Sequence, residues 1–313
     1  MLRPLYPTVK QIALKAYGKI NLGLAVLGRR QDGYHELRTV FQTISLADRL
    51  GVRLTSGRPE VRLEVRGLAV PEGRSNLAVL AAASLLAELK LRARVEIQLD
   101  KRIPPGSGLG GASSDAAVVL RAGAMLSGRS LPRERLLRLA LKLGSDVPFF
   151  LYGGRALGLG RGEEVYPLPE EARRHCVLFF PGEGMNTAEA YQSLRRGRLT
   201  PQKAGPRIEM FCSAVNESME SARGEPFREL DNDFETLVFR KFPVLAQAKK
   251  MLRQAGAETA SLSGSGSVVY GLFRDASQAR SAARQLRGRA KPSEEVFLAR
   301  TVSRRECQAR PPA

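Results

Sequence analysis

The sequence has few of the residues that build disulfide frameworks and metal centres. Its 313 residues include three cysteines, two histidines and no tryptophan. Cys176, Cys212 and Cys307 are odd in number, widely separated and without metal-ligand spacing, which argues against a disulfide framework or a structural zinc site. His35 and His175 are too few for a multi-histidine metal centre. We therefore expect a reducing compartment, the cytoplasm, and no dedicated metal site.

The sequence also lacks a segment long enough to cross a membrane. Its best apolar run, 77–87, ends at Glu88 and is shorter than the roughly 20 residues that a bilayer requires. The N-terminal stretch Met-Leu-Arg-Pro-Leu-Tyr-Pro has no apolar core of the signal-peptide kind. With 43% apolar and 26% charged residues, we expect a folded protein with no membrane partner. Its length allows two domains, or one large domain with a deep cleft.

Acidic residues are scarce relative to basic ones, 31 against 50, which gives a formal charge of +19. A basic surface attracts nucleic acids, anionic lipids and nucleotides alike. The excess is spread along the chain, however, and no nucleic-acid-binding module is recognisable. We therefore favour arginines on solvated faces and expect no nucleic-acid partner. A basic nucleic-acid-binding protein remains the alternative from a different functional class.

Strand and helix patterns are mixed irregularly, which favours an α+β fold over a regular βαβ alternation. Strands are predicted at 12–28, 38–45, 61–65, 95–99 and 176–180, with a turn and strand at 261–273. Helices are predicted at 76–89, 133–143, 187–195, 231–255 and 275–288, with another opening at Ser113. Strand-like, glycine-rich sequence fills 149–167, and 196–230 has no clear pattern. The polar stretch 167–174 is the predicted boundary between two domains, 1–168 and 169–313.

The most informative segment is 104–115, Pro-Pro-Gly-Ser-Gly-Leu-Gly-Gly-Ala-Ser-Ser-Asp. Glycines allow backbone N–H groups to converge on a phosphate, and a helix that begins near Ser113 adds unpaired donors and the positive end of its dipole. Four glycines within six residues, followed by two serines, favour a phosphate-binding loop over a plain turn with a helix cap.

Two common nucleotide-binding motifs are excluded. Gly106-x-Gly108-x-x-Gly111 matches the dinucleotide fingerprint, but that motif requires a second strand ending in an acidic residue about 20 positions later. The sequence there is the helical pattern that contains Glu134. A P-loop requires Lys and then Ser or Thr after its last glycine, whereas this chain has Ala112-Ser113.

The loop resembles the Pro-x-x-x-Gly-Leu-Gly-Ser-Ser signature of the GHMP kinases, the family of galactokinase, homoserine kinase and mevalonate kinase. Segment 16–22, Ala-Tyr-Gly-Lys-Ile-Asn-Leu, resembles the family's first motif, and 261–267 resembles its C-terminal glycine motif. Segments 28–37, 144–148 and 186–191 are similar to the branch whose acceptor alcohol carries a cytidine diphosphate group. The matches follow the family's order. Tyr17-Gly18 departs from it, since many relatives have Pro-Ala there.

This resemblance implies a two-domain GHMP kinase fold with the active site in the cleft between the lobes, and ATP-dependent phosphorylation of an alcohol. It gives Asp146 the role of general base, with Lys19 keeping it ionised and screening the reacting oxygens. It assigns nucleotide binding to Asn76, Lys101, Pro105, Gly106, Ser107, Gly108, Leu109, Gly110, Gly111, Ala112, Ser113 and Ser114. Mg²⁺ is expected between the β- and γ-phosphates, as polyphosphate chemistry requires. No acidic cluster indicates a dedicated magnesium site, and Ser113 or Ser114 is the one candidate contact in the sequence.

On the acceptor side, the resemblance assigns substrate binding to Asn21, Tyr34, His35, Thr187, Tyr191, Gly264, Ser265 and Gly266. Aromatic faces stack on a base, and an imidazole can read its edge. We therefore expect a small-molecule substrate with a cytidine diphosphate group.

Plainer interpretations stay open for single residues: Asp146 as a turn residue or cap, Asn76 as a helix N-cap and Lys101 as a solvated strand end. Two alternatives also remain for the whole chain. One is a GHMP kinase acting on a mevalonate-like or amino-acid alcohol, and the other is a regulatory protein with an inactive kinase fold. The sequence is compatible with a monomer or a homodimer.

Overall fold

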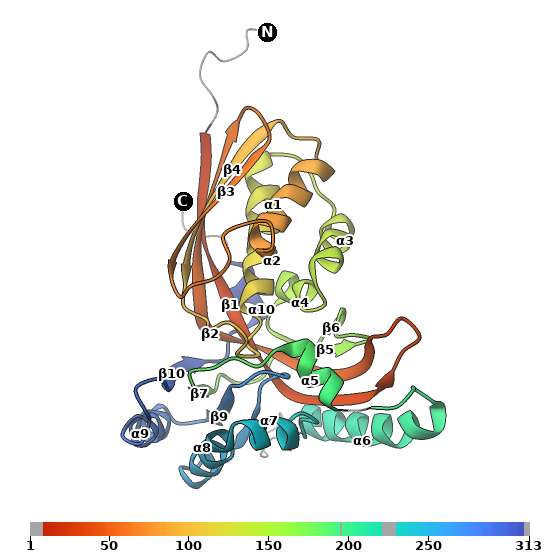
Figure 1. Cartoon of the computed structure of the whole chain (residues 1–313), viewed down its shortest axis with the longest axis vertical. Helices are drawn as coiled ribbons and strands as arrows, with labels where there is room; N and C mark the ends of the chain where they lie inside the picture. Colours follow the sequence, from red (N-terminus) through yellow and green to blue (C-terminus); the bar gives the residue numbers. More distant parts are fainter. Residues whose placement is uncertain (1–8, 195, 221–229, 310–313) are drawn as a thin grey trace.

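The computed structural model describes residues 9–194, 196–220 and 230–309, and its strands form two sheets (Figure 1). The first sheet contains β1 (Val9–Arg29), β2 (His35–Ser56), β3 (Glu60–Gly67), β4 (Ala93–Lys101), β5 (Arg155–Leu159) and β6 (Glu164–Pro167). Its order is β3-β4-β2-β5-β6, and β1 pairs along β2. The second sheet contains β7 (His175–Phe180), β8 (Thr259–Leu262), β9 (Val269–Phe273) and β10 (Glu295–Arg300), in the order β10-β7-β9-β8. The β3–β4 pair is parallel and the other strand pairs are antiparallel.

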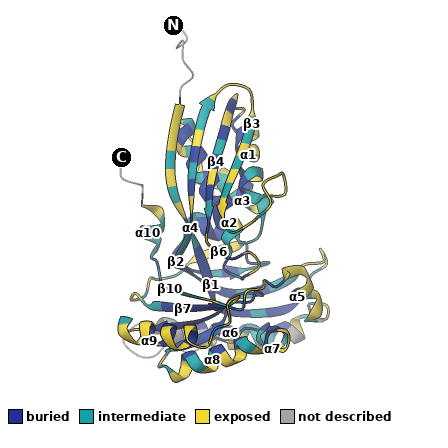
Figure 2. Cartoon of the chain, turned by 60° about the vertical axis from the view of Figure 1, so that its left-hand side comes forward, coloured by how far each residue is buried: buried dark blue, intermediate teal, exposed yellow. Residues whose placement is uncertain are grey.

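Helices cover one face of the first sheet. They are α1 (Leu77–Glu88), α2 (Gly111–Ser127), α3 (Arg133–Leu143) and the short α4 (Val147–Tyr152), and in Figure 1 α1, α2 and α3 lie on the same side of the strands. The alternation in β4 explains this arrangement, because its apolar residues are buried while the polar residues between them are more exposed. Figure 2 shows the same mixture of buried and exposed residues along the neighbouring strands.

The second sheet has its own helices and its own apolar core. The helices in this half are α5 (Thr187–Ser193), α6 (Pro201–Glu220), α7 (Glu235–Lys241), α8 (Pro243–Gln254) and α9 (Ala276–Arg287). The short helix α10 (Arg304–Gln308) lies against α4 in the other half, where Gln308 Nε2 donates to the Tyr152 carbonyl. Leu24, Val26 and Leu37, from the hairpin end of β1 and β2, join this second core. The long β1–β2 hairpin therefore belongs to both halves of the molecule in space.

Most of the predicted elements are confirmed, and the differences have local causes. The predicted helix 231–255 is two helices, α7 and α8, because Pro243 occupies the first position of α8. The stretch 149–167 was expected to be strand-like, but its first residues belong to α4. Part of the unpatterned segment 196–230 is the helix α6, which contains Pro206, while 221–229 lies outside the described residues. Segment 168–174 separates β6 from β7, and the domain division at 168 stays a prediction.

Candidate active site

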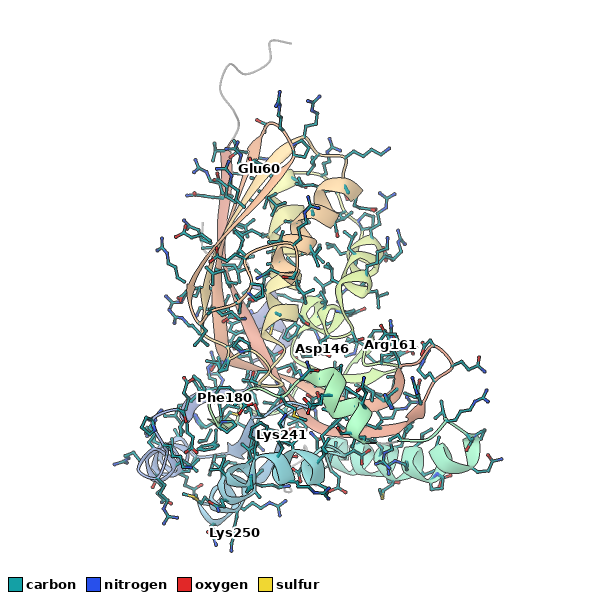
Figure 3. All side chains as sticks on the ribbon, viewed as in Figure 1. Glu60, Asp146, Arg161, Phe180, Lys241 and Lys250 are labelled. Atoms are coloured by element: carbon teal, nitrogen blue, oxygen red, sulfur yellow. The ribbon has the colours of Figure 1, made fainter. Side chains whose placement is uncertain are left out.

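A cavity of about 920 Å³ opens between the glycine loop, the middle of the β1–β2 hairpin and α5. Figure 3 shows Asp146 and Arg161, two of its lining residues, between the upper and lower parts of the molecule. Of the predicted site residues, the cavity is lined by Lys19, Asn21, Tyr34, His35, Lys101, Pro105, Gly106, Ser107, Gly108, Gly110, Gly111, Ala112, Ser113, Asp146, Thr187, Tyr191, Gly264 and Ser265. The cavity thus joins segments that are far apart in the sequence, in a concave form typical of small-molecule sites.

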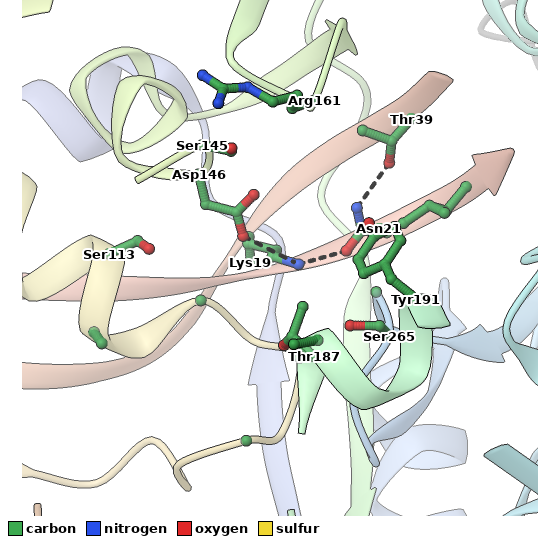
Figure 4. Close-up of a pocket in the computed structure, with 18 of the residues that line it drawn as sticks. Lys19, Asn21, Thr39, Ser113, Ser145, Asp146, Arg161, Thr187, Tyr191 and Ser265 are labelled. Carbon is green, nitrogen blue, oxygen red and sulfur yellow. Dashed lines mark hydrogen bonds and ion pairs between the residues drawn. The ribbon is translucent and has the colours of Figure 1, made fainter. Parts of the chain in front are cut away.

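Lys19 is held at the centre of this cavity by β1 and its neighbours. The β1–β2 register shifts between Tyr17 and Lys19, and such bulges re-aim side chains. The Lys19 ammonium donates to Asn21 Oδ1 at 2.5 Å, and Asn21 Nδ2 in turn donates to Thr39 Oγ1 at 2.7 Å. Figure 4 shows this chain of contacts. The position of the amine is therefore fixed by buried hydrogen bonds.

Asp146 faces Lys19 from the other side of the cavity. The Lys19 Nζ and Asp146 Oδ2 atoms are 3.7 Å apart, with the lysine side chain 4% exposed and the aspartate side chain 32% exposed. Asp146 immediately precedes α4 but makes no capping hydrogen bond with it, so its carboxylate is free to meet a ligand. Burial lowers the pKa of Lys19, and the neighbouring Asp146 carboxylate opposes that change. The arrangement provides a proton acceptor beside a desolvated amine.

The glycine loop presents backbone rather than side chains to the cavity. Gly108 has φ = +81°, and a Cβ atom there would lie 2.1 Å from the carbonyl oxygen of Ser263. The first backbone hydrogen bond of α2 runs from Ser114 N to Gly110 O, and no side chain caps this helix. The amides of residues 111–113 consequently have no partner inside the helix. Unpaired amides at the positive end of a 17-residue helix fit a polyphosphate.

Four residues assigned to ligand binding do not line the cavity. Asn76 caps α1 by accepting from Ala78 N at 2.9 Å. The Ser114 hydroxyl donates to the carbonyl of Tyr17 at 2.7 Å. Leu109 is buried and offers its carbonyl to the backbone N–H of Lys19, and Gly266 packs against the backbone of Gly108. Ser114, Leu109 and Gly266 thus contact the protein around the loop. Asn76 is bonded to the start of α1 and to the Pro71 carbonyl instead.

The acceptor end of the cavity is formed by rings. His35 stacks on Tyr191, with ring centroids 5.3 Å apart, and Tyr191 meets Phe234 edge-on at 4.8 Å. Burial and the nearby Arg29 lower the pKa of His35, which favours the neutral imidazole that can both donate and accept. Tyr34 is 55% exposed, and its ring lies 4.6 Å from the Arg161 guanidinium. These rings provide flat faces at the mouth of the cavity.

The chain resembles known proteins over most of its length. Residues 76–154 match the GHMP kinases N terminal domain, and residues 207–291 match the GHMP kinases C terminal model. The 4-diphosphocytidyl-2-C-methyl-D-erythritol kinase of Solibacter usitatus is 47% identical over 86% of this chain and 83% of its own length. The enzyme of that name from Moorella thermoacetica is 42% identical over 88% of this chain and 94% of its own.

Solved structures give the same result. A crystal structure of 4-(cytidine 5'-diphospho)-2C-methyl-D-erythritol kinase superimposes with a TM-score of 0.74 at 38% identity, covering 93% of this chain and 99% of the other. This chain belongs to the 4-diphosphocytidyl-2-C-methyl-D-erythritol kinase family of GHMP kinases. A homoserine kinase from Cytophaga hutchinsonii, 19% identical with a TM-score of 0.70 over 97% of both chains, shares the fold.

The structure of this GHMP kinase also adds residues that were not predicted. Leu37, Thr39 and Phe41 line the cavity from alternate positions of β2, and Arg161 lines it from the loop after β5. The alternation of β2 was a usable signal, since side chains two residues apart share a face. Arg161, between two glycines, gave no such signal.

No three His, Cys, Asp or Glu side chains among the described residues gather into a group that could hold a metal ion. None of the helices described is both long and apolar enough to cross a membrane.

Proposed function

We propose that this kinase transfers the γ-phosphoryl group of ATP to the 2-hydroxyl of 4-diphosphocytidyl-2-C-methyl-D-erythritol, a step of the non-mevalonate isoprenoid pathway. The observation that carries the proposal is the Lys19–Asp146 pair, whose atoms lie 3.7 Å apart in the cavity that the glycine loop also lines. The relatives and the solved structure with this enzyme name support the substrate.

In the proposed reaction, Asp146 accepts the proton of the attacking hydroxyl, since its carboxylate has no competing capping bond. The Lys19 ammonium, fixed by Asn21, pairs with that carboxylate and offsets the negative charge that develops on the transferred group. Phosphoryl transfer depends mainly on positioning and charge stabilisation. The buried Asn21–Thr39 chain supplies that positioning.

The nucleotide site is proposed at the glycine loop, because residues 111–113 line the cavity and their amides have no partner inside α2. ATP supplies the phosphoryl group there. Mg²⁺ would bind together with ATP beside this loop and would offset the charge of the phosphates, and Ser113, which lines the cavity, would be its protein contact.

The acceptor site is proposed at the rings. Tyr34, His35 and Tyr191 would hold the cytosine by stacking and by edge hydrogen bonds. Arg161, whose guanidinium lies 4.6 Å from the Tyr34 ring, would bind the diphosphate.

We further propose that residues 1–168 and 169–313 form the two lobes, that the kinase works in the cytoplasm, and that its partners are small molecules. The basic excess is then a property of the solvated surface, with no membrane or nucleic-acid partner. A gel-shift titration with random duplex DNA at low and high salt tests the last point.

A coupled ADP-release assay tests the function. The panel contains the cytidine-bearing alcohol, the same polyol phosphate without cytidine, mevalonate and homoserine. ADP release that depends on the cytidine-bearing alcohol supports the proposal, and turnover of mevalonate or homoserine alone would refute it.

The same assay tests the base with Asp146→Asn. We expect this variant to lose about 10²- to 10⁴-fold in kcat while it binds ADP as the native chain does. Full activity in this variant would remove Asp146 from the mechanism.

A further inference from the structure

Directly behind the glycine loop, three ionisable side chains form a buried cluster that the proposed reaction does not use. The Lys101 ammonium, at the end of β4, donates to Asp48 Oδ2 at 2.5 Å and to Asp115 Oδ2 at 2.9 Å. The three side chains are at most 4% exposed. Asp48 comes from β2 and Asp115 from the first turns of α2. Buried charges at this density are costly unless they are paired, so each partner matters.

The cluster ties together the elements that carry the loop. Asp48 Oδ1 accepts from the backbone N–H groups of Arg102 and Ile103, at 2.6 and 2.8 Å, where β4 leads into the loop. A Cβ atom on Gly111 would lie 2.8 Å from Lys101 Nζ, so the ammonium sits closely against the residue that begins α2. One lysine therefore connects both ends of the loop to β2.

Lys101 lines the cavity, and the family resemblance places it near the nucleotide. Its ammonium has three donors, and two of them are engaged by carboxylates that do not line the cavity. This geometry favours an indirect role, through the loop, over a contact made mainly with the nucleotide.

The carboxyl group of Asp115 differs from the other two ionisable groups of the cluster in its hydrogen bonding and its pKa. Its Oδ1 atom is buried without a hydrogen-bond partner. Burial raises the pKa of Asp115 to about 7, Asp48 from β2 adds to the rise, and Lys101 from β4 opposes it. With Asp115 protonated, the three side chains sum to zero charge, and when it ionises they sum to one negative charge behind the amides of residues 111–113.

We propose that Asp48, Lys101 and Asp115 are positioning residues that hold the glycine loop in its nucleotide-binding form, and that ionisation of Asp115 weakens nucleotide binding. This inference rests on the proposed function only in that the loop binds a polyphosphate. Loss of the Asp48 charge frees the β4 end of the loop, and a charge on Asp115 repels the phosphates. Neither carboxylate lines the cavity. Asp48 therefore acts on the ligand through the position of the loop, and Asp115 acts through the electrostatic potential at the loop.

The test measures ADP affinity by calorimetry on the full chain, for the native protein, Asp48→Asn, Asp115→Asn and Asp100→Asn. Asp100 is the matched control, because it lies one residue before Lys101 and pairs with Arg102 at the surface. We expect Asp48→Asn to weaken ADP binding and raise the KM for ATP by about tenfold, since small displacements of a binding group have large effects. The KM for the acceptor should stay within about twofold, which a general loss of structure would not allow.

The second readout is the pH dependence. As the pH rises from about 6 to 8.5, Asp115 ionises and the ADP affinity of the native protein should fall. Asp100→Asn should behave in the same way. The fall should be about threefold to tenfold smaller in Asp115→Asn, which has no carboxyl group to ionise at this position. Asp115→Asn is nearly isosteric with the protonated acid, so it should fold even if Asp48→Asn does not. If ADP affinity depends equally on pH in Asp115→Asn and Asp100→Asn, the inference is overturned. The proposed function still stands in that case, provided that the native protein binds ADP and turns over its substrate. Absence of ADP binding by the native chain at every pH would overturn both.

Discussion

The two ends of the cavity differ in the kind of group that lines them. The nucleotide end is mostly backbone: glycines with positive φ at Gly106, Gly108 and Gly110, and the uncapped start of α2. The acceptor end is mostly side chain: the stacked His35–Tyr191 pair and the exposed Tyr34 ring. Backbone amides recognise a phosphate that every nucleotide shares, whereas rings recognise one particular group. Phosphate binding, which all nucleotides require, therefore depends on the backbone conformation of the loop. Specificity for the acceptor depends on individual side chains.

Among the changes that act on ligand binding, the largest effect should come from adding a single methyl group to the nucleotide end. Gly108→Ala places a Cβ at φ = +81° and 2.1 Å from the Ser263 carbonyl, so strain of about 1–2 kcal/mol adds to a clash with backbone. We expect a loss of about 10²-fold in ADP affinity, because the loop must move. Calorimetry checks it, with Gly73→Ala, where the added atom meets nothing within 4 Å, as the control. Native affinity in Gly108→Ala would show that the loop does not bind phosphate.

At the acceptor end, Tyr191→Leu should be the most damaging single change. It removes the ring that stacks on His35 at 5.3 Å, and base stacking contributes about 1–3 kcal/mol. The KM for the acceptor should rise by about tenfold or more, while the KM for ATP stays unchanged. Tyr166→Leu, on β6 with its ring 52% exposed, is the control. A matched rise in both KM values would contradict the separation of the two ends.

The same contrast explains how far the sequence could predict the site. The glycine loop is a local signal, so residues 104–115 could be assigned to phosphate from their order alone. The Lys19–Asp146 pair and the rings needed the family resemblance, because the two catalytic candidates are 127 positions apart and spacing does not reveal such contacts. The bonds from Lys101 to Asp48 and Asp115 were unpredictable for the same reason. Of the fold, the periodic elements were found, whereas α6 was missed because Pro206 interrupts its pattern.

A smaller, pH-dependent effect should be confined to the acceptor end. Burial and Arg29 place the pKa of His35 below its ordinary 6.5, so the ring is neutral above that pH and becomes a cation only at lower pH. The KM for the acceptor should be flat above pH 6.5 and should rise by about threefold to tenfold towards pH 5, as the ring loses its acceptor nitrogen. His35→Gln should flatten this limb. An acid limb that persists in His35→Gln would assign it to another group.

The smallest effect should come from Asn76, which the family resemblance assigns to the nucleotide but which does not line the cavity. Asn76 caps α1 through Ala78 N and donates to the Pro71 carbonyl at 2.7 Å, which ties down the segment that brings Val70 to the cavity. Asn76→Ala should lower the free energy of unfolding by about 1 kcal/mol, and Asn76→Asp, which can still cap, should recover most of it. Urea titrations should give a lower free energy of unfolding for Asn76→Ala than for Asn76→Asp. ADP affinity should fall by no more than about threefold in Asn76→Ala, because the glycine loop itself is untouched. A fall of tenfold or more would mean that a side chain far from the loop contacts the nucleotide, and the nucleotide end would then no longer be a backbone site.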